Sequence, residues 1–129
     1  MIALDTNILV RYLVEDDVRQ SALAARFIER AGVPLFVPQI VICELVWVLS
    51  FAYDVPRREI VSLLQQLRRA ANIVIESADE VQRAIDAFSG QRGDFADYLI
   101  AERAMTSGCT AVATFDRALL TDKRFAAPA

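Results

Sequence analysis

Short apolar runs alternate along this chain with longer segments that have helical periodicity. The apolar runs are residues 1–4, 33–37, 72–75 and 110–114, and the helical patterns between and after them cover residues 8–14, 16–32, 38–53, 56–71, 77–90 and 94–108. Strands that are separated by helices pair in parallel and need helices on both faces of their sheet. The pattern therefore predicts an α/β protein, a three-layer α/β/α domain around a mainly parallel sheet of about four or five strands.

The length and the apolar content favour one domain. The chain has 129 residues, of which 55% are hydrophobic, and this is enough for one core. We expect a single domain over residues 1–125, followed by a flexible tail at 126–129. Because the apolar fraction is high for a small protein, part of it is expected to contact another chain, in a homodimer or with a bound partner.

A membrane span is the first alternative, since residues 31–53 carry one charge, Glu44. Pro34 and Pro38 interrupt the first half of this segment, and no Lys/Arg cluster flanks it. A charge near the middle of a span costs roughly 2.5 to 3.5 kcal/mol. With no basic stretch before the short apolar start, a signal peptide is not expected either. We expect no membrane association and a cytoplasmic protein.

The residue types that are absent narrow the chemistry. The chain contains no histidine, which excludes imidazole bases, histidine triads and histidine-bound zinc. Cys43 and Cys109 are too few for a disulfide framework, and both are expected as reduced core residues. Catalysis by this chain would have to use carboxylates, hydroxyls or a thiol.

Several acidic residues are predicted to meet at one edge of the sheet. Asp5 and Asp116 each follow an apolar run, at the carboxyl ends of the first and last predicted strands. Glu44 lies in the second turn of the helix that leaves the second strand. The helix that feeds the last strand begins at this edge with Asp94 and Asp97. Such a convergence of four sequence-distant carboxylates, with Asp94 nearby, is typical of a metal site.

Each acidic residue also has a structural explanation when it is taken alone. The aspartates can cap helices, most readily Asp94, and a distant arginine can pair with Glu44. Taken together, however, carboxylates at one edge repel one another unless a cation neutralises them. Their oxygen ligands select Mg²⁺ or Mn²⁺, which typically position a phosphate and a water for in-line displacement. Hydrolysis of a phosphodiester is therefore the leading reaction class, and neutralised carboxylates would make the net charge of −3 compatible with a nucleic-acid substrate.

Four motifs, in this order along the chain, carry a resemblance to a known family. They are Leu4-Asp5-Thr6-Asn7, Val41-Ile42-Cys43-Glu44-Leu45, Asp94-Phe95-Ala96-Asp97-Tyr98-Leu99-Ile100-Ala101 and Thr114-Phe115-Asp116. With them the chain resembles a PIN-domain ribonuclease of the VapC toxin type. The resemblance implies a PIN-like fold and a metal-dependent endoribonuclease that is the toxin of a type II toxin-antitoxin pair. It also implies an RNA substrate, a homodimer and a VapB-type antitoxin that holds the toxin inactive.

The resemblance assigns roles residue by residue. Asp5, Glu44, Asp97 and Asp116 match the acidic quartet around Mg²⁺ or Mn²⁺, which Asp5 and Asp97 would hold most directly. Asn7 and Thr114 match supporting polar positions, and Asp94 matches an additional acid that only some members have. The expected products carry 5′-phosphate and 3′-hydroxyl ends.

Four arginines form a separate feature outside the family motifs. Arg57 and Arg58 recur as Arg68 and Arg69, about 16 Å further along a helix and on the same face. This basic stripe can follow an RNA backbone or receive an acidic partner, or it can be a solvated helix face.

Two other functions compete with the nuclease. A phosphatase of the haloacid-dehalogenase type needs a second aspartate where the chain has Asn7, and a lysine in the site, whereas the only lysine is Lys123. The other alternative is a non-catalytic PIN-like module that binds RNA or protein.

Overall fold

The computed structural model describes residues 1–129, which form two compact units, Met1–Ala78 and Asp79–Ala129. Both units contain helices and parallel strands, which confirms the α/β class. The five strands are divided between a three-stranded sheet and a two-stranded sheet, where the sequence predicted one sheet of four or five strands. The strands have only two or three residues each, shorter than the apolar runs that predicted them.

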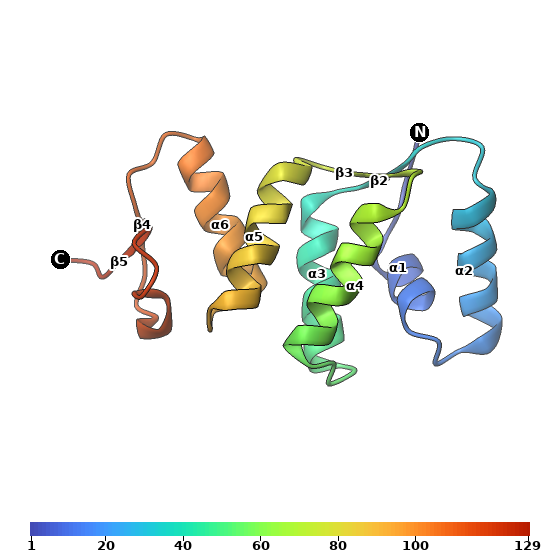
Figure 1. The fold of residues 1–129 in the computed structure, drawn as a ribbon, viewed down its shortest axis with the longest axis horizontal. Coiled ribbons are helices and arrows are strands. Elements are labelled where there is room, and N and C mark those ends of the chain that lie inside the picture. The colour runs from blue at the N-terminus through green and yellow to red at the C-terminus, as the bar shows by residue number, and fades with distance from the viewer. The chain divides into compact units, whose positions relative to one another are not determined.

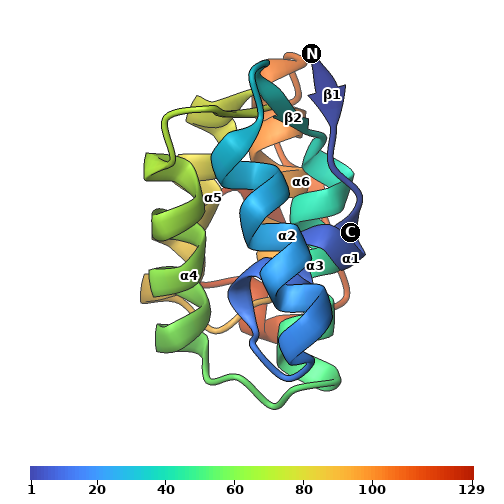
Figure 2. The ribbon, with the colours of Figure 1, turned by 90° about the vertical axis from the view of Figure 1, so that its right-hand side faces the viewer.

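The first unit is built around the three-stranded sheet (Figures 1 and 2). The strand order is β1-β2-β3, and both pairs are parallel. Helix α4 contacts strand β3 of this sheet, and helix α1 packs against both α2 and α3. The elements are β1 (Ile2–Ala3), α1 (Thr6–Leu13), α2 (Val18–Arg30), β2 (Leu35–Val37), α3 (Gln39–Phe51), α4 (Arg57–Arg69) and β3 (Ile73–Ile75).

The central strand and its helices follow from the apolar pattern. Leu35 and Val37 of β2 are completely buried, and Phe36 between them is half-buried, as expected for side chains that alternate across a covered sheet. Pro38 immediately precedes α3, where its missing N–H costs nothing. Pro38 is therefore the whole connection from β2 to α3, and this short link fixes where Glu44 lies.

The second unit contains α5 (Ala78–Gly90, whose first residue closes the first unit), α6 (Phe95–Thr106), β4 (Val112–Ala113), a 3₁₀ turn η1 (Arg117–Leu119) and β5 (Phe125–Ala126). The two strands pair in parallel, with Val112 opposite Phe125. Ala126, the first residue of the predicted tail, pairs with Ala113, and residues 127–129 follow the last element.

Aromatic side chains and ion pairs hold the second unit together. The rings of Phe88 and Phe95 meet edge to face, and so do those of Tyr98 and Phe125. The buried Glu102 carboxylate on α6 accepts hydrogen bonds from Arg83 and from an arginine near β5, Arg124. These contacts join α5, α6 and the C-terminal segment.

Two further expectations concern membranes and cysteines. No helix combines the length and the apolar character that a bilayer crossing requires. Both cysteines are free, but only Cys43 is half-buried, and Cys109 is exposed, so the prediction that both lie in the core was wrong for Cys109. Cys109 follows Gly108, in the exposed turn after the end of α6.

Candidate functional site

Asp5 lies two residues after the end of β1 and caps the helix that comes next. Its Oδ1 accepts a hydrogen bond from the Thr6 N–H at 2.7 Å, and α1 begins at Thr6, two residues before the helix start that the sequence predicted. The buried Leu4 before it anchors the strand end. The cap uses one carboxylate oxygen, and the side chain is exposed, so that Oδ2 remains for a ligand.

Glu44 is joined to this helix start through Thr6. The buried Thr6 hydroxyl donates a hydrogen bond of 3.2 Å to Oε1 of Glu44, which lies in the second turn of α3. Asp5, Asn7 and Glu44 line one pocket, together with Thr6, Val10, Arg11, Val48 and Tyr53. The structure thus brings together two of the predicted carboxylates and one of the predicted supporting residues.

Glu44 is exposed, although its neighbours in the sequence are apolar. The helical period puts Ile40, Glu44, Trp47 and Phe51 along one side of α3, and all four are exposed. The opposite side, with Ile42, Leu45 and Leu49, is completely buried. This exposed side is itself largely apolar, so a contact with another chain there stays a prediction.

Arg11, a cation that is not among the predicted site residues, lines the same pocket. The Arg11 guanidinium donates to Asp16 Oδ1 at 2.8 Å and to Gln20 Oε1 at 2.7 Å, and Tyr53 donates its hydroxyl proton to Asp16 Oδ2 at 2.9 Å. The Tyr53 hydrogen bond, and after it the Arg11 bond, lower the pKa of Asp16. The i, i+4 spacing of Asn7 and Arg11 on one helix face was the available signal.

The second unit positions Asp94 and Asp97 at the start of α6. The Asp94 N–H donates to Oδ2 of Asp97 at 3.0 Å, as in a capping box. Burial raises the pKa of the Asp97 carboxyl, and the charges of Asp94 and Asp116 raise it further, against the hydrogen bond from the Asp94 N–H. Asp116 is therefore close enough to Asp97 for their charges to interact.

Asp116 caps the 3₁₀ turn that follows β4. Its Oδ1 accepts from the Ala118 N–H at 2.9 Å, and its own N–H donates to the Thr114 hydroxyl at 3.0 Å. Thr114 thus holds the backbone of the loop that presents Asp116, and its role in the site stays a prediction. Thr114 is half-buried and Asp116 is exposed.

The acidic residues form two groups, Asp5 with Glu44 in the first unit and Asp94, Asp97 and Asp116 in the second. No three acidic side chains lie close enough together to hold a metal ion by themselves. The convergence of the four quartet residues at one metal therefore stays a prediction.

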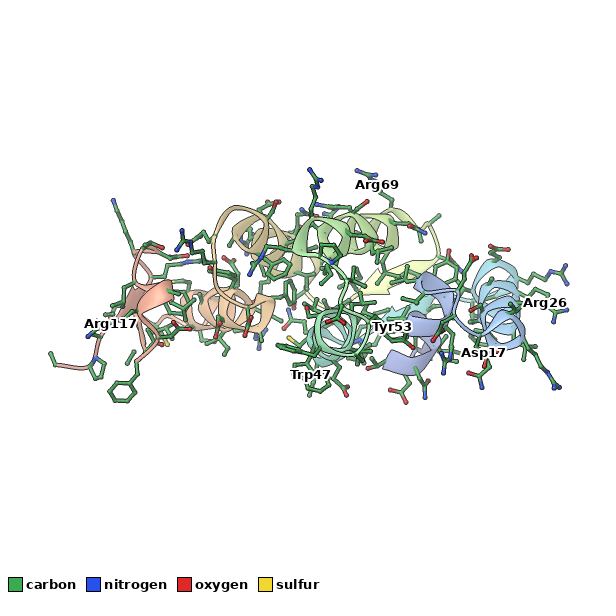
Figure 3. All side chains as sticks on the ribbon, turned by 90° about the horizontal axis from the view of Figure 1, so that it is seen from below. Asp17, Arg26, Trp47, Tyr53, Arg69 and Arg117 are labelled. Atoms are coloured by element: carbon green, nitrogen blue, oxygen red, sulfur yellow. The ribbon has the colours of Figure 1, made fainter.

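The predicted basic stripe lies on α4. Arg58, Arg68 and Arg69 are exposed and Arg57 is half-buried. Figure 3 shows Arg69 pointing outward from α4. The stripe belongs to the first unit but does not line the pocket of Asp5 and Glu44.

A family model and a known protein each match nearly the whole chain. The family model of the PIN domain matches residues 2–125. The chain is also 29% identical over 116 residues to the VapC ribonuclease of Aquifex aeolicus (strain VF5), an alignment that covers 88% of this chain and 86% of that protein. Residues of both units fall within these matches.

Proposed function

The chain belongs to the PIN-domain family, and from this premise we propose that it is an Mg²⁺- or Mn²⁺-dependent endoribonuclease. We further propose that it acts as the toxin of a VapBC-type toxin-antitoxin pair, as its likeness to a VapC ribonuclease suggests. The observation that carries the nuclease proposal is the pairing of Asp5 and Glu44 in one pocket, with Thr6 joining their helices. Two carboxylates in an open pocket repel each other, and a cation between them removes this repulsion.

The donor set fits a hard divalent cation. The proposed ligands are the carboxylates of Asp5, Glu44, Asp97 and Asp116, and oxygen ligands of this kind suit Mg²⁺ or Mn²⁺. When bound, the cation would activate a water and stabilise the charge on the phosphate that is attacked.

The remaining residues hold these carboxylates in place. The Thr6 hydroxyl fixes Glu44, the Asp94 N–H fixes Asp97, and Thr114 fixes the backbone before the Asp116 side chain. Such partners keep a carboxylate oriented before the ligand arrives. The side chain therefore loses less conformational entropy when the ligand binds. In this scheme Asn7 lines the pocket as a polar contact for the substrate or its water.

The variant Asp97→Asn is expected to show whether the Asp97 carboxylate is a metal ligand or only a helix cap. Since burial raises the pKa of Asp97, the folded state prefers the protonated acid, and this contribution to stability is lost as the pH rises through the folded-state pKa. Asparagine keeps an oxygen for the Asp94 N–H but cannot ionise. The variant should therefore melt at a slightly higher temperature than the wild type at neutral pH without metal.

In Mn²⁺ the order of the two melting temperatures should reverse, so that the wild type melts at a higher temperature than Asp97→Asn. A ligand at 100 times its dissociation constant stabilises a folded protein by about 2.7 kcal/mol, and the variant should lose most of that gain. Thermal melts with Mn²⁺ or with EDTA measure both effects, and Asp86→Asn, an exposed carboxylate on α5, serves as the control. Equal stabilisation of all three proteins by Mn²⁺ would contradict the metal site.

The alternative is a PIN-like module that binds RNA or protein without cutting it. The complete set of four carboxylates favours the enzyme, because binding alone gives no reason to gather acids that repel a phosphate. A folded protein that Mn²⁺ stabilises and that binds RNA, yet leaves it intact, would instead support the module.

The proposed partners are a VapB-type antitoxin and a second copy of the chain, and the proposed location is the cytoplasm. The exposed side of α3 offers an apolar surface for protein contact, where Trp47 is 62% and Phe51 64% exposed. The rings of these two residues lie 5.5 Å apart and form one continuous patch. Large aromatic side chains are the residues that contribute most to protein interfaces.

We propose the basic stripe on α4 as a contact for RNA or for an acidic segment of the antitoxin. Reversing Arg58 and Arg68 to glutamate should weaken one of these two interactions by about 10-fold or more, because each reversal removes a favourable charge and adds a repulsive one. RNA cleavage rates and antitoxin affinity measure the two contacts separately. The stripe would be only a solvated face if both stayed unchanged.

A further inference from the structure

Arg11 lies where two pockets of the first unit meet. It lines the pocket of Asp5 and Glu44, in which it is the only cationic residue. It also lines the neighbouring apolar pocket between α1 and α2, together with Asn7, Ile8, Gln20, Leu23, Ala24 and Phe27. A chain of nucleotides that reaches the carboxylates from the side of α2 would therefore pass this guanidinium.

The guanidinium is held in place by groups from three parts of the chain. Asp16 precedes α2, Gln20 lies within α2, and Tyr53 follows α3, and all three are within hydrogen-bonding distance of Arg11. Tyr53 lies beside α1 in Figure 3. None of these hydrogen bonds uses NH2 of Arg11, so that two N–H donors remain, and 31% of the side chain is exposed.

This arrangement suits a phosphate better than a purely structural ion pair. An exposed ion pair such as Arg11 with Asp16 adds little to stability, so the three partners are better explained as groups that orient the guanidinium. Arginine binds phosphate oxygens with parallel N–H donors, and a pocket whose other charges are carboxylates needs a cation to tolerate the neighbouring phosphates of an RNA.

We propose that Arg11 contacts the phosphate of single-stranded RNA next to the one that is cleaved, and that Asp16 and Tyr53 position its guanidinium for this contact. This inference rests on the proposed nuclease function. Arg11 is then a substrate-binding residue that determines on which side of Asp5 the RNA enters.

Binding of a fluorescent single-stranded RNA of mixed sequence, measured in EDTA at several salt concentrations, tests the proposal without cleavage. Arg11→Gln should raise the dissociation constant by about 10-fold and reduce the slope of log affinity against log salt by about 1, since one phosphate contact is lost. Arg11→Lys should restore the slope, because it restores the charge.

Two matched variants separate this role from a structural one. Arg26→Gln removes the same charge from α2, where the side chain points away from α1 (Figure 3), and should leave the slope unchanged. Asp16→Asn keeps the Arg11 cation but weakens the ion pair that positions it, so it should raise the dissociation constant less than Arg11→Gln does and leave most of the slope in place.

The outcomes distinguish the two proposals. If Arg11→Gln and Arg26→Gln gave the same slope as the wild type, Arg11 would be a structural tether and the inference would be wrong, while the nuclease proposal would stand. A wild-type protein that neither binds RNA in this assay nor cleaves it in Mn²⁺ would overturn both.

Discussion

Asp5→Asn is expected to reduce RNA cleavage by roughly 100-fold or more while the protein stays folded. The loss should be large because the carboxylate would hold the cation that stabilises the developing charge, and losing one such interaction typically costs 10²- to 10³-fold. The fold should persist because asparagine caps a helix as well as aspartate does. Its side-chain oxygen can still accept the hydrogen bond from the Thr6 N–H.

The chain offers a matched control for this variant. Asp17 caps α2 by accepting a hydrogen bond of 3.0 Å from the Gln20 N–H, and it does not line the pocket of Asp5 and Glu44. Asp17→Asn therefore makes the same chemical change in the same structural role. Single-turnover cleavage in Mn²⁺, with melting temperatures for both variants, measures the effects. Equal activity of the two variants would leave Asp5 as a helix cap only.

Gly93→Ala is expected to destabilise the protein by about 3 kcal/mol, at the upper end of the usual cost of overpacking. A Cβ at this buried position would lie 2.3 Å from Leu119 Cδ2 and 2.8 Å from the Tyr98 hydroxyl oxygen. The leucine side chain can move, but Tyr98 is completely buried and its oxygen accepts the Gly93 N–H at 2.7 Å. The strain would fall immediately before Asp94 and the start of α6.

Gly90→Ala is the control for this second prediction. Gly90 ends α5, and an added Cβ there would meet no atom within 4 Å. Its substitution should change stability by less than about 1 kcal/mol and favour the helix. Urea unfolding at neutral pH measures both variants. Gly93→Ala with the stability of Gly90→Ala would show that the loop accommodates the methyl group without cost.

The class of fold could be predicted from the sequence because it depends on periodicity. The β2 run and the helix after Pro38 were found within two residues of their true ends, since buried strands and helix starts leave strong local signals. The division of five strands between two sheets was not predicted. Strands of two residues, such as β1 and β4, contain too little pattern to reveal their partners.

The candidate site was predictable in part for the same reason. The positions of Asp5 and Glu44 follow from the direction of β1 and α3, and the structure brings them to one pocket. Thr6 and Arg11 were missed as functional groups because their roles depend on side-chain contacts with Glu44 and Asp16, 38 and 5 residues away. Such contacts require the packed helices, which periodicity alone does not place.

The chemistry of the cut RNA ends tests the central claim most directly. A carboxylate-held cation directs water at the phosphodiester, whereas cleavage without metal proceeds through the neighbouring 2′-hydroxyl. RNA incubated with the purified protein in Mn²⁺ should carry 5′-phosphate and 3′-hydroxyl ends, which can be ligated without prior phosphorylation, and EDTA should prevent cleavage. Ends with 5′-hydroxyl and cyclic phosphate groups, or cleavage that persists in EDTA, would contradict a metal-dependent nuclease built on Asp5, Glu44, Asp97 and Asp116.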